Sequence, residues 1–280
     1  MDNIIREKRL ISLNSNNASR YMNGSYLSDV AFDFNSILSN ESAILYVEAG
    51  LQSAEIPVTF YNIDITNNQF NYTIDDVTWT VVISSGSYNY NNFVSAMSTQ
   101  FLLNGHVFSF VLNRATNILT MCLTSGGIAW TSILTSSMYY IIGIPNAQMT
   151  YDVVANSFTY PQMFNLLGQK KLKIYSSNLA IDSFDSVGNQ TNNLICTLSV
   201  NQPSFGMILY NNFDSVYGHM KTSYLSTVDI QIRDELGNAI NFNNINWTMT
   251  IVLILYKKVS SIISDLTINP DDTLPGIRDK

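Results

Sequence analysis

Residues 225–256 read LSTVDIQIRDELGNAINFNNINWTMTIVLILY and contain two predicted strands. Between residues 228 and 233 apolar and polar side chains alternate, which indicates a strand with one buried face. Residues 233–238 concentrate charge, glycine and asparagine, which predicts a turn. Residues 247–256 are almost wholly apolar and rich in β-branched side chains. This second strand is therefore predicted to be covered on both faces, in the interior of a β structure.

The composition suits a β protein with a large core and a surface that carries few charges. Hydrophobic residues make up 46% of the 280 residues, and charged residues make up 12%, which is about half the usual share in a soluble domain. Asparagine, serine and threonine are abundant, so uncharged amides and hydroxyls must solvate much of the surface. Such a surface favours packed assemblies over an isolated monomer.

The acidic charge balance argues against nucleic-acid binding as the main function. The net charge is -7 and the pI is about 4.7, whereas binding to phosphates requires clustered cations. Three short basic clusters, at residues 6–9, 170–173 and 257–258, are interpreted as solvated strand ends, with contact to a genome or an inner membrane as the alternative. Residues 1–9 are polar, and no apolar run reaches about 18 residues, so we expect neither a signal peptide nor a transmembrane segment.

Short strand-like segments recur along most of the chain. Besides the two above, strands are predicted at residues 26–35, 43–48, 56–63, 69–73, 77–84, 107–112, 118–124, 138–144, 171–175, 194–200 and 207–210. Residues 88–103 instead have apolar side chains at helical spacing, with Asn89 or Asn91 as the N-cap, and predict one helix that docks on a sheet. This pattern favours an antiparallel sandwich or jelly roll over alternating βα units.

The chain is expected to have three parts. Residues 1–25 are polar and Asn-rich and are interpreted as an N-terminal arm. Residues 26–258 are predicted to form a single domain, with a loop or insertion at residues 145–168, where the strand pattern is less regular. Residues 259–280 are interpreted as a flexible C-terminal tail. The arm and the tail are the segments expected to become ordered on assembly.

No residue pattern points to catalysis or to a bound cofactor or metal. No cysteine or carboxylate pattern near His106 or His219 in the sequence indicates a catalytic role. Both histidines are therefore interpreted as structural. Cys122 and Cys196 lie in apolar runs and are expected to be buried free thiols. The acid pairs at residues 75–76 and 271–272 lack the alternating acids of a calcium loop and are interpreted as turns. We therefore predict no catalytic, cofactor-binding or metal-binding residues, and no enzymatic activity.

Five stretches, in the same order along the chain, resemble the minor capsid, or penton, proteins of virophages and Polinton-like viruses. They lie between residues 53 and 256 and read SAEIPVTFYNID, YNYNNFVSAMSTQFL, FSFVLNRATNILTM, IYSSNLAID and TVDIQIRDELGNAINFNNINWTMTIVLILY. The first is similar to an early strand with an IP-x-x-FYNI signature, and the last to a D-E-x-G-N turn followed by an aromatic-bearing final strand. The chain differs from this family at residues 141–144, which read IIGI where relatives commonly have Leu-Leu-Gly-Phe. The sequence LLG at residues 166–168 is an alternative match to the same family motif.

The resemblance implies an all-β single jelly roll of two face-to-face antiparallel four-stranded sheets, with one short helix and insertions. It implies a penton subunit that forms homopentamers at the fivefold vertices of an icosahedral capsid. The partner at the vertex would be a major capsid protein, which has a double jelly roll. This chain, with 280 residues, is too short to form a double jelly roll itself. The expected location is the capsid vertex of the virion, with synthesis and assembly in the host cytoplasm. Residues 225–256 would form the last hairpin of the jelly roll.

The alternative is a jelly-roll carbohydrate-binding module, in which aromatic and amide side chains would bind sugars. Trp79, Trp130 and Trp247 lie in apolar surroundings, however, and are predicted to belong to a core and not to a stacking platform. A jelly-roll enzyme ranks third, because such enzymes typically carry a His-rich metal site and this chain has two histidines.

Overall fold

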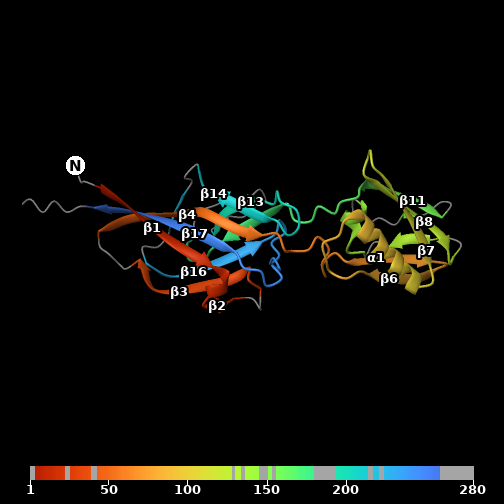
Figure 1. Ribbon diagram of the computed structural model, residues 1–280, viewed down its shortest axis with the longest axis horizontal. Helices are drawn as coiled ribbons and strands as arrows, with labels where there is room; N and C mark the ends of the chain where they lie inside the picture. Colours follow the sequence, from red (N-terminus) through yellow and green to blue (C-terminus); the bar gives the residue numbers. More distant parts are fainter. Residues whose placement is uncertain are drawn as a thin grey trace, which may run out of the picture.

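Two antiparallel sheets pack against each other in one part of the molecule (Figure 1). The first has the strand order β1 (Ile4–Asn14), β17 (Thr248–Lys258), β4 (Ile44–Pro57) and β14 (Met207–Asn211), and β15 (Gly218–His219) also pairs with β4. The second has the order β13 (Leu194–Ser199), β12 (Lys171–Tyr175), β16 (Leu225–Arg233), β3 (Asp29–Leu38) and β2 (Arg20–Tyr21). The computed structural model describes residues 4–22, 26–38, 43–127, 130–133, 136–144, 151–152, 156–179, 193–213, 217–220 and 224–258.

The strands follow one another in the order of a jelly roll. Along the chain, β1, β4, β14 and β17 enter the first sheet, while β3, β12, β13 and β16 enter the second. Paired in this way, the eight strands form two facing layers with strand orders β1-β17-β4-β14 and β13-β12-β16-β3. The predicted all-β single jelly roll is confirmed, but within the described residues each sheet has five strands instead of four, because the short strands β15 and β2 extend them.

The core between the sheets confirms the predicted burial of both strands in residues 225–256. On β16, Val228, Ile230 and Ile232 are completely buried, as the alternating pattern predicts. On β17, every side chain from residue 251 to residue 255 is at most 1% exposed. This strand lies between two neighbours, β1 and β4, so its edges are paired as well as its faces covered. The most apolar segment of the chain is thus the centre of the first sheet.

The expectation that residues 225–256 form a hairpin is wrong. β16 pairs with β3 and β12, whereas β17 pairs with β1 and β4, so the two strands lie in opposite sheets. The predicted turn exists: the amide of Asp234 donates to the carbonyl of Asn238 at 3.0 Å, and Gly237 has a φ of 91°. Residues 239–247 then carry the chain across the sandwich. A pattern of two strands and a turn does not specify which strands pair.

The prediction of an N-terminal arm at residues 1–25 is wrong for residues 4–14. These residues form β1, which pairs with β17 along its whole length. Ile11 and Leu13 point into the core, at 6% and 1% exposure, while Arg6 and Lys8 are exposed. The charged side chains among residues 6–9 concealed the alternation of buried and exposed positions in the sequence. The 3₁₀ helix η1 (Ser15–Asn17) follows β1. The predicted tail, residues 259–280, lies outside the described residues.

Between β4 and β12 the chain forms a second hydrophobic core beside the jelly roll (Figure 1). One sheet has the order β10 (Tyr151–Asp152), β9 (Trp130–Ile133), β5 (Gln69–Ile74) and β6 (Val77–Val82). The other has the order β11 (Ser157–Met163), β8 (Ile118–Ser125) and β7 (Val107–Asn113). The sequence suggested an insertion only at residues 145–168. Periodicity alone did not reveal this larger unit, because its strands have the same pattern as those of a single sandwich.

The predicted helix is confirmed as α1 (Tyr90–Leu103). The side chain of Asn89 accepts from the amide of Asn92 at 3.0 Å, which caps the N-terminus as expected. Phe93, Met97 and Phe101 are completely buried, but they pack in the second core and not on the jelly roll. No helix among the described residues is long and apolar enough to cross a membrane.

Residues 138–144, predicted as a strand, instead form the short helix α2 (Tyr139–Ile142), which ends at Gly143. Gly143 has a φ of 96°, and a Cβ at this position would lie 2.2 Å from the carbonyl oxygen of Gln162. Both observations require glycine here. The stretch IIGI therefore has glycine at the position whose backbone geometry requires it, and its three isoleucines fill the second core.

Candidate functional site

The two histidines lie in different parts of the molecule. His106 is 5% exposed in the second core, where its Nδ1 lies 2.9 Å from the hydroxyl of Tyr72. Burial lowers the pKa of His106, and the nearby Asp75 carboxylate opposes this shift. His219, on β15, is exposed and contacts the ring of Tyr46 edge-on. Within the described ranges, no group of three or more His, Cys, Asp or Glu side chains is arranged to hold a metal ion.

The acid pair at residues 75–76 forms the turn between β5 and β6. Both residues have positive φ angles, 49° and 63°, which suits a tight hairpin with two left-handed positions. The pair at residues 271–272 lies outside the described residues. The tryptophans predicted to be core residues are buried at positions 130 and 247, with 2% and 0% exposure, and Trp79 is half-buried against His106. None of the three presents a flat, open stacking platform.

The two cysteines are partly buried and unpaired, in different parts of the fold. Cys122 on β8 donates to the hydroxyl of Ser157 at 3.1 Å. Cys196 on β13 packs against the jelly-roll core, and burial raises the pKa of its thiol from 9.0 to about 12. At neutral pH, Cys196 is therefore a protonated, weakly nucleophilic thiol.

We expect Cys196 to react slowly with iodoacetamide in the folded protein at pH 9 and rapidly in urea. The folded-state pKa lies above the ordinary value of 9.0, so this thiol stabilises the protein below about pH 9, and that contribution is lost as the pH rises toward 12. A Cys122→Ser background isolates the reaction of Cys196, which mass spectrometry can follow. Equal rates in buffer and in urea would contradict the prediction.

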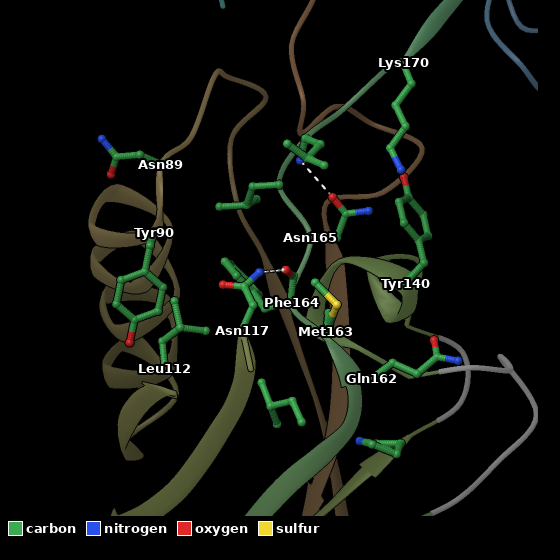
Figure 2. A pocket seen from close by; sticks show the side chains of 14 residues that line it. Asn89, Tyr90, Leu112, Asn117, Tyr140, Gln162, Met163, Phe164, Asn165 and Lys170 are labelled. Carbon is green, nitrogen blue, oxygen red and sulfur yellow. Dashed lines mark hydrogen bonds between the residues drawn. The ribbon is translucent and has the colours of Figure 1, made fainter. Parts of the chain in front are cut away.

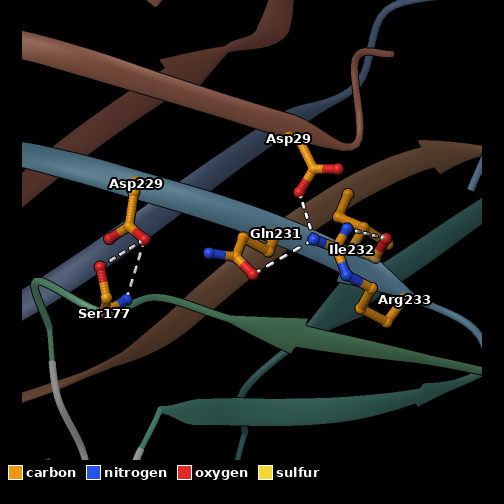
Figure 3. A network of polar contacts seen from close by, with 6 residues as sticks. All are labelled: Asp29, Ser177, Asp229, Gln231, Ile232 and Arg233. Atoms are coloured by element: carbon orange, nitrogen blue, oxygen red, sulfur yellow. Dashed lines mark hydrogen bonds and ion pairs between the residues drawn. The ribbon is translucent and has the colours of Figure 1, made fainter. Parts of the chain in front are cut away.

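A buried polar network ties the second sheet to the loop that follows β12 (Figure 3). Asp229 on β16 is 2% exposed and accepts four hydrogen bonds of 2.7 to 2.9 Å. The donors are the hydroxyls of Ser176 and Ser177 and the backbone amides of Ser177 and Asn178. The Ser-Ser-Asn-Leu stretch after β12 is thus held by one carboxylate. The alternating pattern had assigned Asp229 to the polar face of its strand without revealing this partner.

A separate buried polar cluster joins β3 to β16. Arg233 forms an ion pair with Asp29, and its guanidinium also donates to the side chain of Gln231 at 3.2 Å (Figure 3). The side chains of Asp29 and Arg233 are 1% and 13% exposed. Desolvated charges of this kind are retained in a fold only when they are paired. Asp29, Asp229 and Arg233 therefore position strands and loops, and nothing in their surroundings assigns them a reaction.

The second core carries a pocket of about 930 Å³ beside α1 (Figure 2). Its walls combine apolar side chains such as Leu112 and Met163 with amides and two tyrosines, and Lys170 stands at one end. The hydroxyl of Tyr90 donates to a carbonyl, and that of Tyr140 accepts from Asn67. Both tyrosine hydroxyls therefore already have a partner within the protein.

The edge strand β14 exposes a row of apolar side chains. Ile208 points into the jelly-roll core, and the alternate side chains therefore face outward. The outward side chains of the strand are Met207 (43% exposed), Leu209 (69%) and Asn211, and two exposed phenylalanines, Phe205 (79%) and Phe213 (87%), lie beyond its two ends. The sequence predicted this strand but not its exposure. The sequence signal that could have indicated this exposed apolar surface is the pair of phenylalanines that flank the apolar strand.

No known protein-family model matches the chain. No curated protein matches it either. Among solved structures, the chain is similar to the crystal structure of the selenomethionine-labelled mavirus penton protein. The sequence identity is 10% and the TM-score is 0.48, over 92% of this chain and 100% of that chain.

Proposed function

We propose that this protein is a structural capsid protein, the penton subunit that forms homopentamers at the fivefold vertices of an icosahedral capsid. The observation that carries the proposal is the agreement between the resemblance in sequence and the jelly roll. The stretch containing IPVTFYNI ends β4 and begins the second core, and IYSSNLAID begins with the last two residues of β12 and the loop held by Asp229. The last stretch contains β16 and β17. The described parts of these three stretches thus lie on strands of the jelly roll, on the loop after β12 and at the start of the second core.

The surface supports an assembling protein over a freely diffusing one. Charged residues are few, and the apolar row on β14 is exposed to water in a single subunit. Exposed apolar edges of this kind are avoided in monomers because they promote association. In a ring, one subunit presents two different surfaces to its neighbours, and fivefold rotation closes the contact. The vertex, a major capsid protein as partner and assembly in the host cytoplasm are parts of the same proposal.

Light scattering of the purified protein, followed by negative-stain imaging, tests the pentamer. We expect a mass of about five subunits of 31.4 kDa and ring-shaped particles. Co-expression with the virus's double-jelly-roll capsid protein should then place the subunit at the vertices of the resulting particles. A different closed ring, or particles whose vertices lack the protein, would overturn the proposal.

A glycan array on the same sample tests the carbohydrate-binding alternative. The structure does not favour it, because the tryptophans are buried or half-buried and the tyrosine hydroxyls of the pocket have internal partners. We expect no glycan binding by a monomeric form. A stable monomer that binds a defined glycan would replace the capsid proposal by the binding module.

A further inference from the structure

β14 forms one end of the first sheet. In the strand order β1-β17-β4-β14, its hydrogen-bonded neighbour among the described strands is β4. The other side of β14 therefore presents backbone amide and carbonyl groups that the described strands do not pair. Edge strands in monomeric proteins are usually protected by a charged side chain, a proline or a bulge. Residues 207–211 read MILYN and contain no charge and no proline.

The apolar row on β14 is large enough to form the centre of a protein interface. Phe205, Met207, Leu209 and Phe213 together expose about 500 Å² of side chain, if an aromatic side chain presents about 200 Å² when fully exposed and Leu or Met slightly less. A standard interface buries about 800 Å² on each partner. The row therefore supplies more than half of such an area, and this part is apolar, as interface centres are.

The opposite end of the same sheet has a complementary character. β1 exposes Leu10 (60%) on the outer face, together with the charges of Arg6 and Lys8. Next to β14, Leu209 pairs across the strands with Glu55 of β4, whose side chain is exposed. One edge thus combines apolar side chains with an acid, and the other combines an apolar side chain with two bases. Contact between them would place opposite charges together.

Strand direction also permits this contact. Each of the three pairings from β1 to β14 is antiparallel, so β14 runs opposite to β1. A second copy placed beside the first therefore brings its β1 alongside β14 in an antiparallel orientation, without inverting the sheet. Leu209 and Leu10 both lie on the outer face and would become neighbours across the junction. The two surfaces differ, so the contact is heterologous and can close a ring.

We propose that the apolar row on β14 is the docking surface for a second copy of this chain, which contacts it through the β1 edge. The inference rests on the proposed ring and specifies which surfaces close it. It assigns the exposed apolar side chains of β14 a role that the isolated subunit does not explain.

Leu209→Asp tests the surface, and Leu103→Asp is the matched control. Leu103 is a leucine of similar exposure, 75%, on α1 of the second core. We expect wild type and Leu103→Asp to have the same oligomeric mass in light scattering, and Leu209→Asp to fall to about 31 kDa with an unchanged circular-dichroism spectrum. An oligomer that persists in Leu209→Asp would overturn the assignment of β14 as the docking surface but would not contradict the proposed ring. A wild-type chain that stays monomeric at high concentration overturns the self-contact.

Disulfide cross-linking identifies the partner surface. Leu10→Cys combined with Leu209→Cys should form a ladder of covalent oligomers on mild oxidation, and wild type, with Cys122 and Cys196, should form none. Each single variant should remain uncross-linked. Dimers from Leu209→Cys alone would show a symmetric contact between two β14 strands and overturn the assignment to β1. If the double variant remains oligomeric but forms no ladder of covalent oligomers, the assignment to β1 is overturned as well.

Discussion

Trp247→Ala is expected to lower the free energy of unfolding by about 4 kcal/mol, because truncation of a buried aromatic side chain leaves a large cavity. Trp247 is completely buried immediately before β17, and its indole nitrogen donates to the carbonyl of Leu27 at 2.8 Å. Its backbone is bonded to Ser15 of η1, directly after β1, and its ring contacts Phe32 of the other sheet edge-on. One side chain thus joins both layers of the jelly roll. Urea denaturation followed by circular dichroism measures the loss.

Two variants separate the contributions at this position. Trp247→Phe retains most of the ring but leaves the Leu27 carbonyl without its donor, so we expect a smaller loss, of about 2 kcal/mol. Trp79→Ala, in the second core, should cost less than Trp247→Ala because Trp79 is only half-buried. Equal losses for the two alanine variants would show that Trp247 does not organise the jelly roll.

Asp229→Ala should lower the free energy of unfolding by about 3 kcal/mol, since it removes a buried charged acceptor and leaves four donors without it. The loop at residues 176–178 should then exchange its amide hydrogens faster. Asp229→Asn should show an intermediate loss, because an amide has one acceptor oxygen and presents its own donors to the loop. Denaturation and hydrogen exchange measured on the same variants test both effects.

Asp33→Ala is the matched control on the neighbouring strand β3. Asp33 binds Arg20 and Thr227 at the surface, and hydrogen bonding to Arg20 lowers the pKa of its carboxyl group. Exposed pairs contribute little to stability, so this variant should unfold almost as wild type does. A loss from Asp33→Ala as large as that from Asp229→Ala would contradict the importance assigned to burial.

Local features of the fold could be predicted because each depends on neighbouring residues. The burial of β17, the cap of α1 at Asn89 and the hairpin of β7 and β8 all follow from periodicity and turn-forming residues. In that hairpin, Asn117 adopts a φ of 55°, as a tight turn requires. These features gave the all-β class and, with the family resemblance, the jelly roll. The buried network of Asp229 was not predictable, because its partners lie more than 50 residues away.

The sequence by itself determined most of the strands of the jelly roll and the presence and approximate place of α1, and it contained no recognisable catalytic or metal-binding motif. Only the tertiary structure decided that residues 4–14 are a strand, that β16 and β17 belong to opposite sheets, and that residues between β4 and β12 build their own core. It also decided that Leu209 faces water. The physical reason is that a strand pattern specifies two faces but no partner. Partners, and therefore the free edges available for assembly, are set by contacts between residues far apart in the chain.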